Sequence, residues 1–151
     1  MENFYTTSSD KITRQYFDSL LLEARYLDSA IPSTNFSLFG KEFSTPIMTA
    51  ALSHLHNTTE YGMIIYAKAA KLSDAVHWVG MGEDSELEEI VKTGAASIKI
   101  VKPHADNKEV FRKIEHAEKA GCFAVGMDID HSFAGDGNFD NVLGLPMAAK
   151  S

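Results

Sequence analysis

The spacing of hydrophobic and polar residues predicts that short buried strands alternate with amphipathic helices from residue 46 onward. Apolar runs of strand length occupy 47–51, 75–79, 97–101 and the stretch from Gly121 to His131. Helical spacing fills 58–72, 85–93 and 107–120. Residues that favour helix starts stand at 58–60, 84–85 and 106–107, and Gly94 and Gly121 stand where helices should end. The pattern therefore predicts four successive strand–helix rounds.

The fourth strand has two very different faces, because side chains alternate along a strand. One face carries large apolar side chains and is expected to pack against helices; these are Phe123, Val125, Met127 and Ile129. The other face is small and ends in two acids; it carries Ala124, Gly126, Asp128 and Asp130. The small face predicts either a packed strand interior or a ligand site.

Two further elements are predicted ahead of this alternation. An amphipathic helix should begin at Ser9 or Asp10, continue with apolar residues as far as 25–27, and end before Pro32. Alternating apolar and polar residues over 36–44, centred on Gly40 and Lys41, predict a β-hairpin.

Strands separated by helices of this length indicate right-handed crossovers and a parallel sheet whose loops share one end. Such a sheet is either a small doubly wound sheet or half of an eight-stranded barrel. The chain has no Gly-x-Gly-x-x-Gly after its first strand, and a helix plus hairpin would cover the closed bottom of a barrel, so we favour the barrel. We expect an α/β single domain, 1–151, with the helix and hairpin in 1–45 and the first four βα units of a TIM (β/α)8 barrel in 46–151.

Length, charge and cysteine content narrow the class of protein. A complete barrel takes about 200–250 residues, so a 151-residue chain is expected to be the N-terminal portion of one, or a half-barrel that pairs with something. The net charge of -7 argues against nucleic-acid and anionic-membrane partners. A single cysteine, Cys122, excludes an intrachain disulfide and is interpreted as a buried thiol, which favours a reducing, cytoplasmic location.

Histidines and carboxylates in the loops after the strands offer one candidate chemistry. His54 and His56 follow the first strand and His104 follows the third, while the fourth leads to Asp128, Asp130 and His131. These are the ligand types of zinc and other divalent ions, so a divalent-metal-dependent barrel enzyme is an alternative hypothesis. The aspartates could equally cap a loop. We interpret His77 as a packing residue and His116 as a solvent-facing one.

Lysines near the same loops raise two further questions. Lys99 alternates with Ile98 and Ile100 inside the third strand, and a buried amine there could form a Schiff base, although a lysine facing the helices is the commoner arrangement. If Asp128 and Asp130 point into one mouth, like-charge repulsion should raise the affinity of one of them for a proton, or the pair needs a cation such as Lys99 or Lys102.

Two segments resemble the FMN-dependent 2-hydroxy acid oxidases and dehydrogenases, which include glycolate oxidase and lactate oxidase. The segment 36–50, FSLFGKEFSTPIMTA, is similar to the stretch that leads into that family's first barrel strand. The segment 116–130, HAEKAGCFAVGMDID, resembles the family's A-E-x-A-G helix end and its fourth strand. The resemblance runs from about Arg14 to Asp130 and covers the first half of such a protein.

The resemblance implies FMN as the cofactor and a set of cofactor-binding positions at the strand ends. These positions fall on Ala51, Leu52, Ser53, Gly80, Ile100, Lys102 and Asp128. Asp128 stands where the family has a threonine, and its negative charge near the flavin would disfavour reduced anionic flavin. No Arg or Lys occurs in 131–145, where the family's substrate-binding arginine is expected.

The implied activity is oxidation of a small 2-hydroxy acid, similar to lactate or glycolate, with this chain contributing the first half of the barrel. The family's base histidine, second arginine and phosphate loop belong to the other half, so no catalytic residue is assigned here and the chain alone is expected to be inactive. The expected partner is the missing half or a second copy. A half-barrel that only binds or assembles, without cofactor, remains the non-enzymatic alternative.

Overall fold

The computed structural model describes residues 8–24, 26–28, 30–129, 138 and 141–147. The chain falls into two units, Met1–Ser33 and Thr34–Ser151. Each unit is described by itself, and the single-domain organisation stays a prediction. Among the described residues, no helix is both long and apolar enough to cross a membrane.

The first unit contains helix α1, Ser8–Ser19, which is shorter than the sequence pattern predicted. The hydroxyl of Ser19 donates to the Tyr16 carbonyl at 2.6 Å, so a side chain occupies a backbone acceptor of the last turn. Its apolar residues Ile12, Tyr16 and Phe17 are each more than 60% exposed. Without a packed face, a short helix gains little from extension, and the predicted continuation through 25–27 is wrong.

The second unit opens with the predicted hairpin, formed by β1 (Phe36–Leu38) and β2 (Lys41–Phe43). Its turn lies at Phe39 and Gly40, one residue earlier than predicted, and both have positive φ, 47° and 77°. Left-handed backbone at both turn positions matches the twist of two-residue hairpins.

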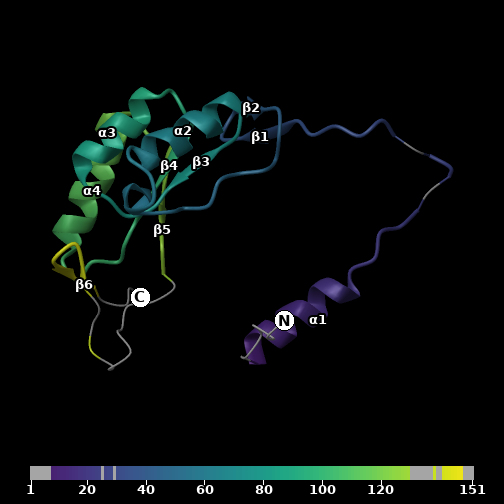
Figure 1. Ribbon diagram of the computed structural model, residues 1–151, viewed down its shortest axis with the longest axis horizontal. Helices are drawn as coiled ribbons and strands as arrows, with labels where there is room; N and C mark the ends of the chain where they lie inside the picture. The colour runs from purple at the N-terminus through teal and green to yellow at the C-terminus, as the bar shows by residue number, and fades with distance from the viewer. Residues whose placement is uncertain (1–7, 25, 29, 130–137, 139–140, 148–151) are drawn as a thin grey trace. The chain divides into compact units, whose positions relative to one another are not determined.

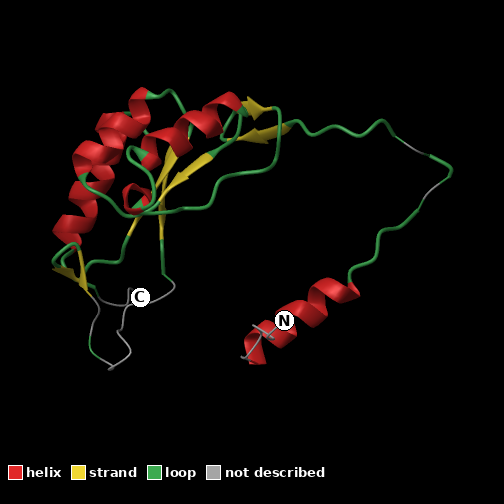
Figure 2. Ribbon diagram, in the orientation of Figure 1, coloured by secondary structure: helices red, strands yellow, loops and turns green. Residues whose placement is uncertain are grey.

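A three-stranded parallel sheet follows in the order β3-β4-β5, with β3 at His77–Val79, β4 at Ser97–Val101 and β5 at Ala124–Met127. Helices α2 (Gly62–Leu72), α3 (Asp84–Lys92) and α4 (Asn107–Ala120) connect and cover it, as Figures 1 and 2 show. A short hairpin, β6 (Asn141–Val142) and β7 (Leu145–Pro146), comes last. The predicted parallel α/β arrangement is confirmed.

The predicted first strand, 47–51, is an extended segment rather than a regular strand. It runs beside β3: the Thr49 amide donates to the Val76 carbonyl at 3.1 Å, and Leu52 forms an isolated parallel bridge with Val79. The Trp78 amide, however, donates to the Thr49 hydroxyl at 2.9 Å instead of to a carbonyl. A side chain thus replaces one step of the ladder.

Helix α2 begins four residues later than predicted. Leu55–Asn57 forms a 3-10 turn first, and Tyr61 at the N-cap has a φ of 57° and no side-chain cap bond. Gly62 lies against this turn, because a Cβ there would meet the Leu55 carbonyl oxygen at 2.6 Å. The predicted caps at 58–60 and at 84–85 are therefore wrong, since Glu83 is the N-cap of α3 and also lacks a side-chain cap bond.

Helix α4 has the predicted bounds and caps. The Asp106 carboxylate accepts from the Lys108 amide at 2.8 Å, and Gly121 ends the helix with a φ of 92°. The bond to Asp106 and the bond from the Gly121 amide to the Glu118 carbonyl, at 3.0 Å, satisfy backbone groups that a helix leaves open at its ends.

Two apolar clusters hold the second unit together. One lies between the sheet and the helices and includes Met63, Val79, Leu87, Ile90 and Ala117. The other lies under the β1–β2 hairpin at the amino end of the sheet, where Phe43 packs with Val76, Ala96 and Ile98. The hairpin therefore covers the amino end of the sheet, as predicted.

The large face of the fourth strand is less covered than predicted. Val125 and Met127 are 37% and 41% exposed, because β5 is the edge strand of the described sheet. Phe123, in contrast, packs against the hairpin with its ring 5.9 Å from that of Phe43. Val125 pairs in register with Lys99 and therefore lies on the helix-facing side of the sheet, as predicted, but the helices cover Val125 and Met127 only in part.

Candidate functional site

The residues predicted to bind the cofactor lie where the parallel strands end. Six of the seven predicted positions, all except Ile100 inside β4, lie there, and together with Met81 we call them the carboxyl rim; its members are Ala51, Leu52, Ser53, Gly80, Met81, Lys102 and Asp128. It combines the extended first segment with the residues that directly follow β3, β4 and β5. Because the strands are parallel, their carboxyl ends share one edge of the sheet.

The first segment and the end of β3 are in close backbone contact. The Gly80 amide donates to the Leu52 carbonyl at 3.0 Å, and the Met81 amide donates to the Ser53 hydroxyl at 2.6 Å. A Cβ at Gly80 would meet Ser53 Oγ at 2.4 Å and the Leu52 carbonyl oxygen at 2.6 Å. Only glycine fits at residue 80 with the segment in this place. Ala51 and Leu52 remain exposed, Leu52 to 42%.

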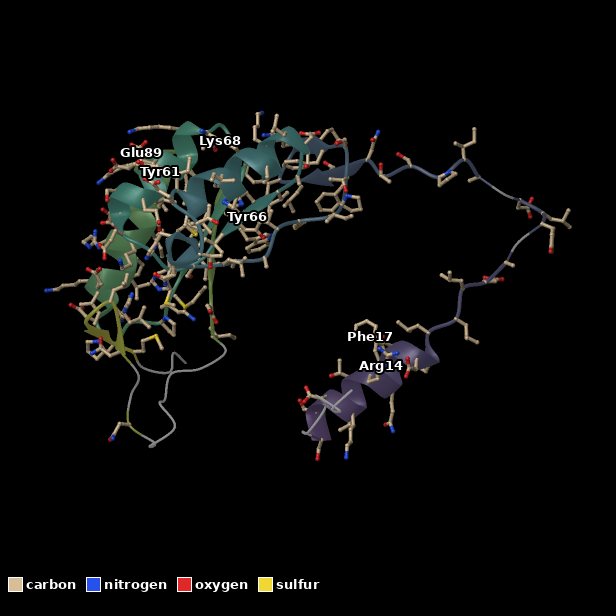
Figure 3. The ribbon with its side chains drawn as sticks, viewed as in Figure 1. Arg14, Phe17, Tyr61, Tyr66, Lys68 and Glu89 are labelled. Carbon is tan, nitrogen blue, oxygen red and sulfur yellow. The ribbon has the colours of Figure 1, made fainter. Side chains whose placement is uncertain are left out.

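Tyr66 holds the same segment from helix α2. The phenol oxygen of Tyr66, which is labelled in Figure 3, accepts from the Ala50 amide at 3.1 Å. The Tyr66 ring lies 5.2 Å from that of His77. His77 is fully buried, and its Nδ1 lies 3.0 Å from the Thr49 hydroxyl. Burial lowers the pKa of His77 to about 4. The interpretation of His77 as a packing residue is confirmed.

Lys102 and Asp128 form an ion pair across the ends of β4 and β5. Lys102 is 8% exposed, and the side chain of Asp128 is 28% exposed. Of the two lysines considered, Lys102 is the one that pairs with Asp128, while Asp130 lies outside the described residues. A paired carboxylate carries little net field, so the predicted penalty on reduced flavin is largely cancelled.

Ile100 lies on the face of the sheet that is turned away from the helices. It pairs in register with Gly126, and Ile98 pairs with Ala124 in the cluster under the hairpin. A Cβ at Gly126 would meet Ile100 Cδ1 at 2.9 Å, so the small residue leaves room for Ile100.

Lys99 lies on the opposite face, toward the helices. It is in register with Val79, which belongs to the cluster between sheet and helices, and it is 7% exposed. Its ammonium donates to the Gly80 carbonyl at 2.5 Å. Burial, together with a smaller effect from the neighbouring charge of Lys113, lowers the pKa of Lys99 to about 8. The structure supports the helix-facing interpretation of Lys99 over the Schiff base.

The histidines of the alternative metal hypothesis lie apart. His54 and His56 are exposed, with rings 5.7 Å apart, on the turn before α2. His104 is 2% exposed and bridges to Met147 after β4. Asp130 and His131 lie outside the described residues. Within the part of the chain that the structure describes, no three His, Cys, Asp or Glu residues gather as a metal site.

His116 and Cys122 both lie partly inside the helix layer. The prediction that His116 faces solvent is wrong. Its Nε2 lies 3.2 Å from the Asp84 carbonyl oxygen, and its side chain is 22% exposed. Cys122 packs against the cluster between sheet and helices, and burial raises the pKa of its thiol. Both are structural positions.

A cleft of about 480 Å³, lined by none of the carboxyl-rim residues, lies between the start of α2 and helix α3. Tyr61 and Glu89, labelled in Figure 3, line it together with Glu60 and Glu86. Three carboxylates would repel a phosphate group. The cleft is therefore a poor candidate for a phosphorylated cofactor.

Sequence reasoning missed two members of this arrangement. Met81 takes part through its backbone amide, which any residue supplies, so no side-chain signal could have found it. Thr49 joins β3 and His77 through its hydroxyl, and a threonine inside an apolar run gives only a weak signal.

Comparison with known proteins gives one family and one fold. The family model described as FMN-dependent dehydrogenase matches residues 5–151. None of the curated proteins matches the chain. Among solved structures, mandelate oxidase with 3,3-difluoro-2-hydroxy-3-phenylpropionic acid matches with a TM-score of 0.73 and 20% identity, over 91% of this chain and 45% of that chain.

Two further mandelate oxidase structures are similar. A point variant with (S)-mandelic acid has the same TM-score of 0.73, identity of 20% and coverage of 91% and 45%. A variant with a monooxide FMN adduct matches at a TM-score of 0.61 and 22% identity, over 67% of this chain and 32% of that chain. The chain thus spans less than half the length of these structures. They confirm the predicted fold as part of a TIM barrel, unclosed over the described residues.

Proposed function

The chain belongs to the FMN-dependent dehydrogenase family, and from this premise we propose that it supplies the first half of an FMN-binding barrel that oxidises a small 2-hydroxy acid. The observation that carries the proposal is the carboxyl rim. Four neighbouring elements, the first segment and strands β3, β4 and β5, bring predicted cofactor positions to one edge of the parallel sheet. That edge is where α/β barrels carry their chemistry.

The residues present suit a flat, electron-accepting cofactor. Ala51 and Leu52 are exposed beside Gly80, which has no side chain, so backbone groups are open to a planar ring. Lys102 adds an ammonium and Asp128 a carboxylate, both held by their mutual pairing. When bound, FMN supplies the acceptor for the electrons and hydrogen removed from the carbon that bears the substrate hydroxyl.

Each of the seven predicted cofactor positions has a proposed role in holding that cofactor. The backbone of Ala51, Leu52 and Ser53 contacts the ring, Gly80 allows the close approach, and Ile100 packs beneath it on the inner face. Lys102 offers the cofactor a hydrogen-bond donor, while Asp128 orients Lys102. None of these roles needs a proton transfer by the described residues.

The proposed substrate is a 2-hydroxy acid of the lactate or glycolate size. Mandelate oxidase, a structural neighbour, is described with (S)-mandelic acid, which belongs to the same chemical class and carries a phenyl group. We further propose a cytoplasmic protein that works as a homo-oligomer or with the other half of a barrel. The single cysteine and the open edge at β5 support these two proposals.

The test is FMN binding by the purified chain. We expect added FMN to lose fluorescence on binding, and yellow protein to survive gel filtration and to release FMN on denaturation. Lys102→Met should weaken binding about tenfold, the loss of one charge-assisted interaction. Lys68→Met on the exposed side of α2 is the matched control and should leave it unchanged.

The remaining outcomes separate the alternatives. Protein that neither quenches FMN fluorescence nor retains the cofactor would refute the proposal. If such colourless protein carried zinc, it would support the metal-dependent enzyme, and if it were metal-free, the assembly module. For the substrate class, titration of the yellow protein with lactate, glycolate and mandelate should perturb the flavin spectrum, with the smaller acids bound more tightly.

A further inference from the structure

We propose that Lys99 is a positioning residue: from the helix-facing side of the sheet, its ammonium fixes the Gly80 peptide and thereby the part of the carboxyl rim that receives the cofactor. The inference rests on the proposed function for the identity of the ligand. The contacts that support it lie among residues 49–53, 80–81 and 99.

The Gly80 carbonyl lies outside the hydrogen-bonded ladder between β3 and β4. Strand β3 ends at Val79, and the last pair in its register with β4 is Val79 with Lys99. Gly80 lies beyond that pair. Its carbonyl oxygen accepts from Lys99 Nζ at 2.5 Å, so a side chain provides the bond that the ladder no longer supplies.

The same peptide leads directly to the first segment. The Gly80 amide donates to the Leu52 carbonyl, and the next amide, from Met81, donates to the Ser53 hydroxyl. Lys99 is thus linked to Leu52 through a single residue. A shift of the Gly80 carbonyl would move both of these donors.

A buried charge makes Lys99 an unfavourable residue for packing alone. It is 7% exposed, and the oxygen that it contacts is neutral. The charged and titratable groups that face it are Lys113 on α4, Asp84 and Glu86 on α3, and the thiol of Cys122. Lys113 disfavours its charge, and burial disfavours it most. A methionine would fill similar space without a buried charge.

The variant Lys99→Met distinguishes a positioning role from a packing role, because the two roles predict different changes in FMN affinity and in stability. In Lys99→Met, we expect the FMN dissociation constant to rise about tenfold, because one charge-assisted hydrogen bond to the rim is lost. The denaturation midpoint should stay the same or rise, because a buried charge is removed. Lys68→Met, on an exposed surface, should change neither quantity. Unchanged FMN affinity, or affinity and midpoint that fall together, would overturn the proposal.

Amide hydrogen exchange tests the positioning without the cofactor. In Lys99→Met, the amides of Gly80 and Met81 should exchange about tenfold faster, while those of Ile98 and Ile100 should not change. If the wild-type chain fails to bind FMN, the proposed function fails, and this exchange alone decides the role of Lys99. Equal protection of Gly80 and Met81 in both proteins would then count against it.

If Lys99→Met does not fold, the wild-type chain provides the same test through pH. Loss of the Lys99 proton weakens a charge-assisted bond to a neutral one. The exchange rate of Gly80 relative to Ile100 should therefore rise as the pH passes the range in which Lys99 titrates. A constant ratio from pH 7 to pH 10 would overturn the proposal.

Discussion

The two ends of the parallel sheet are built on opposite principles. At the amino end, Phe43 and its neighbours form an apolar cluster beneath the hairpin, with rings such as Phe123 in edge contact. At the carboxyl end, the buried ammonium of Lys99 donates to the Gly80 carbonyl, and Lys102 forms an ion pair with Asp128. One end gains stability from burial, whereas the other spends part of it on buried polar groups.

The contrast shows where substitutions should affect stability and where they should affect binding. The free energy gained by apolar burial grows with the buried area and changes little when side chains shift slightly. The strength of hydrogen bonds and ion pairs, in contrast, depends on the distance and angle between the partners. Changes at the amino end should therefore alter the free energy of unfolding. Changes at the carboxyl rim should alter cofactor affinity more than stability.

The largest expected effect is at the amino end. Phe43 is 3% exposed in the hairpin cluster, and Phe43→Ala should lower the free energy of unfolding by about 3–5 kcal/mol. Chemical denaturation measures this. Phe111→Ala, at a side chain that is 63% exposed on α4, is the control and should cost less than about 1 kcal/mol. FMN affinity of the folded fraction should not change; a large loss would erase the distinction between the two ends.

The next largest expected effect is a loss of folding stability in acid, caused by His77 at the amino end of the sheet. The pKa of His77 is about 4 in the folded chain because of burial, against 6.5 for an ordinary histidine. The unfolded chain therefore binds the proton more tightly, and stability should be full above pH 6.5 and fall as the pH drops toward 4. The difference is about 3 kcal/mol. Urea denaturation at both pH values measures it.

The control for this pH dependence is His77→Gln, which has no titrating group at that position. The part of the slope between pH 6.5 and pH 4 that disappears in the variant belongs to His77. Identical slopes in the two proteins would mean that the histidine is not buried in its neutral form.

Two glycine-to-alanine variants compare the carboxyl rim with the hairpin turn at the amino end. Gly80→Ala should cost about 1–3 kcal/mol, because its Cβ would overlap the Leu52 carbonyl and push the first segment aside. It should also abolish FMN binding. Gly40→Ala in the hairpin turn should cost about 1 kcal/mol through its positive φ, with no nearby atom to displace, and leave FMN affinity intact. Fluorescence titration and denaturation of both variants measure the difference.

The smallest effect concerns neither end of the sheet. Asp106→Ala removes the side-chain cap of α4 and should lower the free energy of unfolding by about 1 kcal/mol, without a change in FMN affinity. Asp106→Asn keeps an accepting oxygen and should retain most of the stability. Equal losses in the two variants would show that the charge, rather than the cap bond, stabilises the helix.

Local sequence patterns were sufficient wherever one residue and its near neighbours decide the structure. Helix α4 has its predicted bounds because Asp106 caps its start and Gly121 ends it, both through bonds to adjacent backbone. The hairpin and the parallel strands β3, β4 and β5 follow equally from short periodic runs. The first segment and the start of α2 were predicted less well, because Thr49 bonds to Trp78 far along the chain and Gly62 lies against the 3-10 turn at Leu55, which the periodic pattern does not show.

The order of residues along the chain was enough to predict the α/β order of the elements, the end of the sheet at which polar residues gather, and the likeness to flavin enzymes. Which of those polar groups meet follows only from the folded arrangement. Lys102, not Lys99, pairs with Asp128, while Lys99 turns to the helices and binds the Gly80 carbonyl. Alternation places neighbouring residues on opposite faces, but partners across the sheet are set by register and backbone approach, which depend on the whole fold.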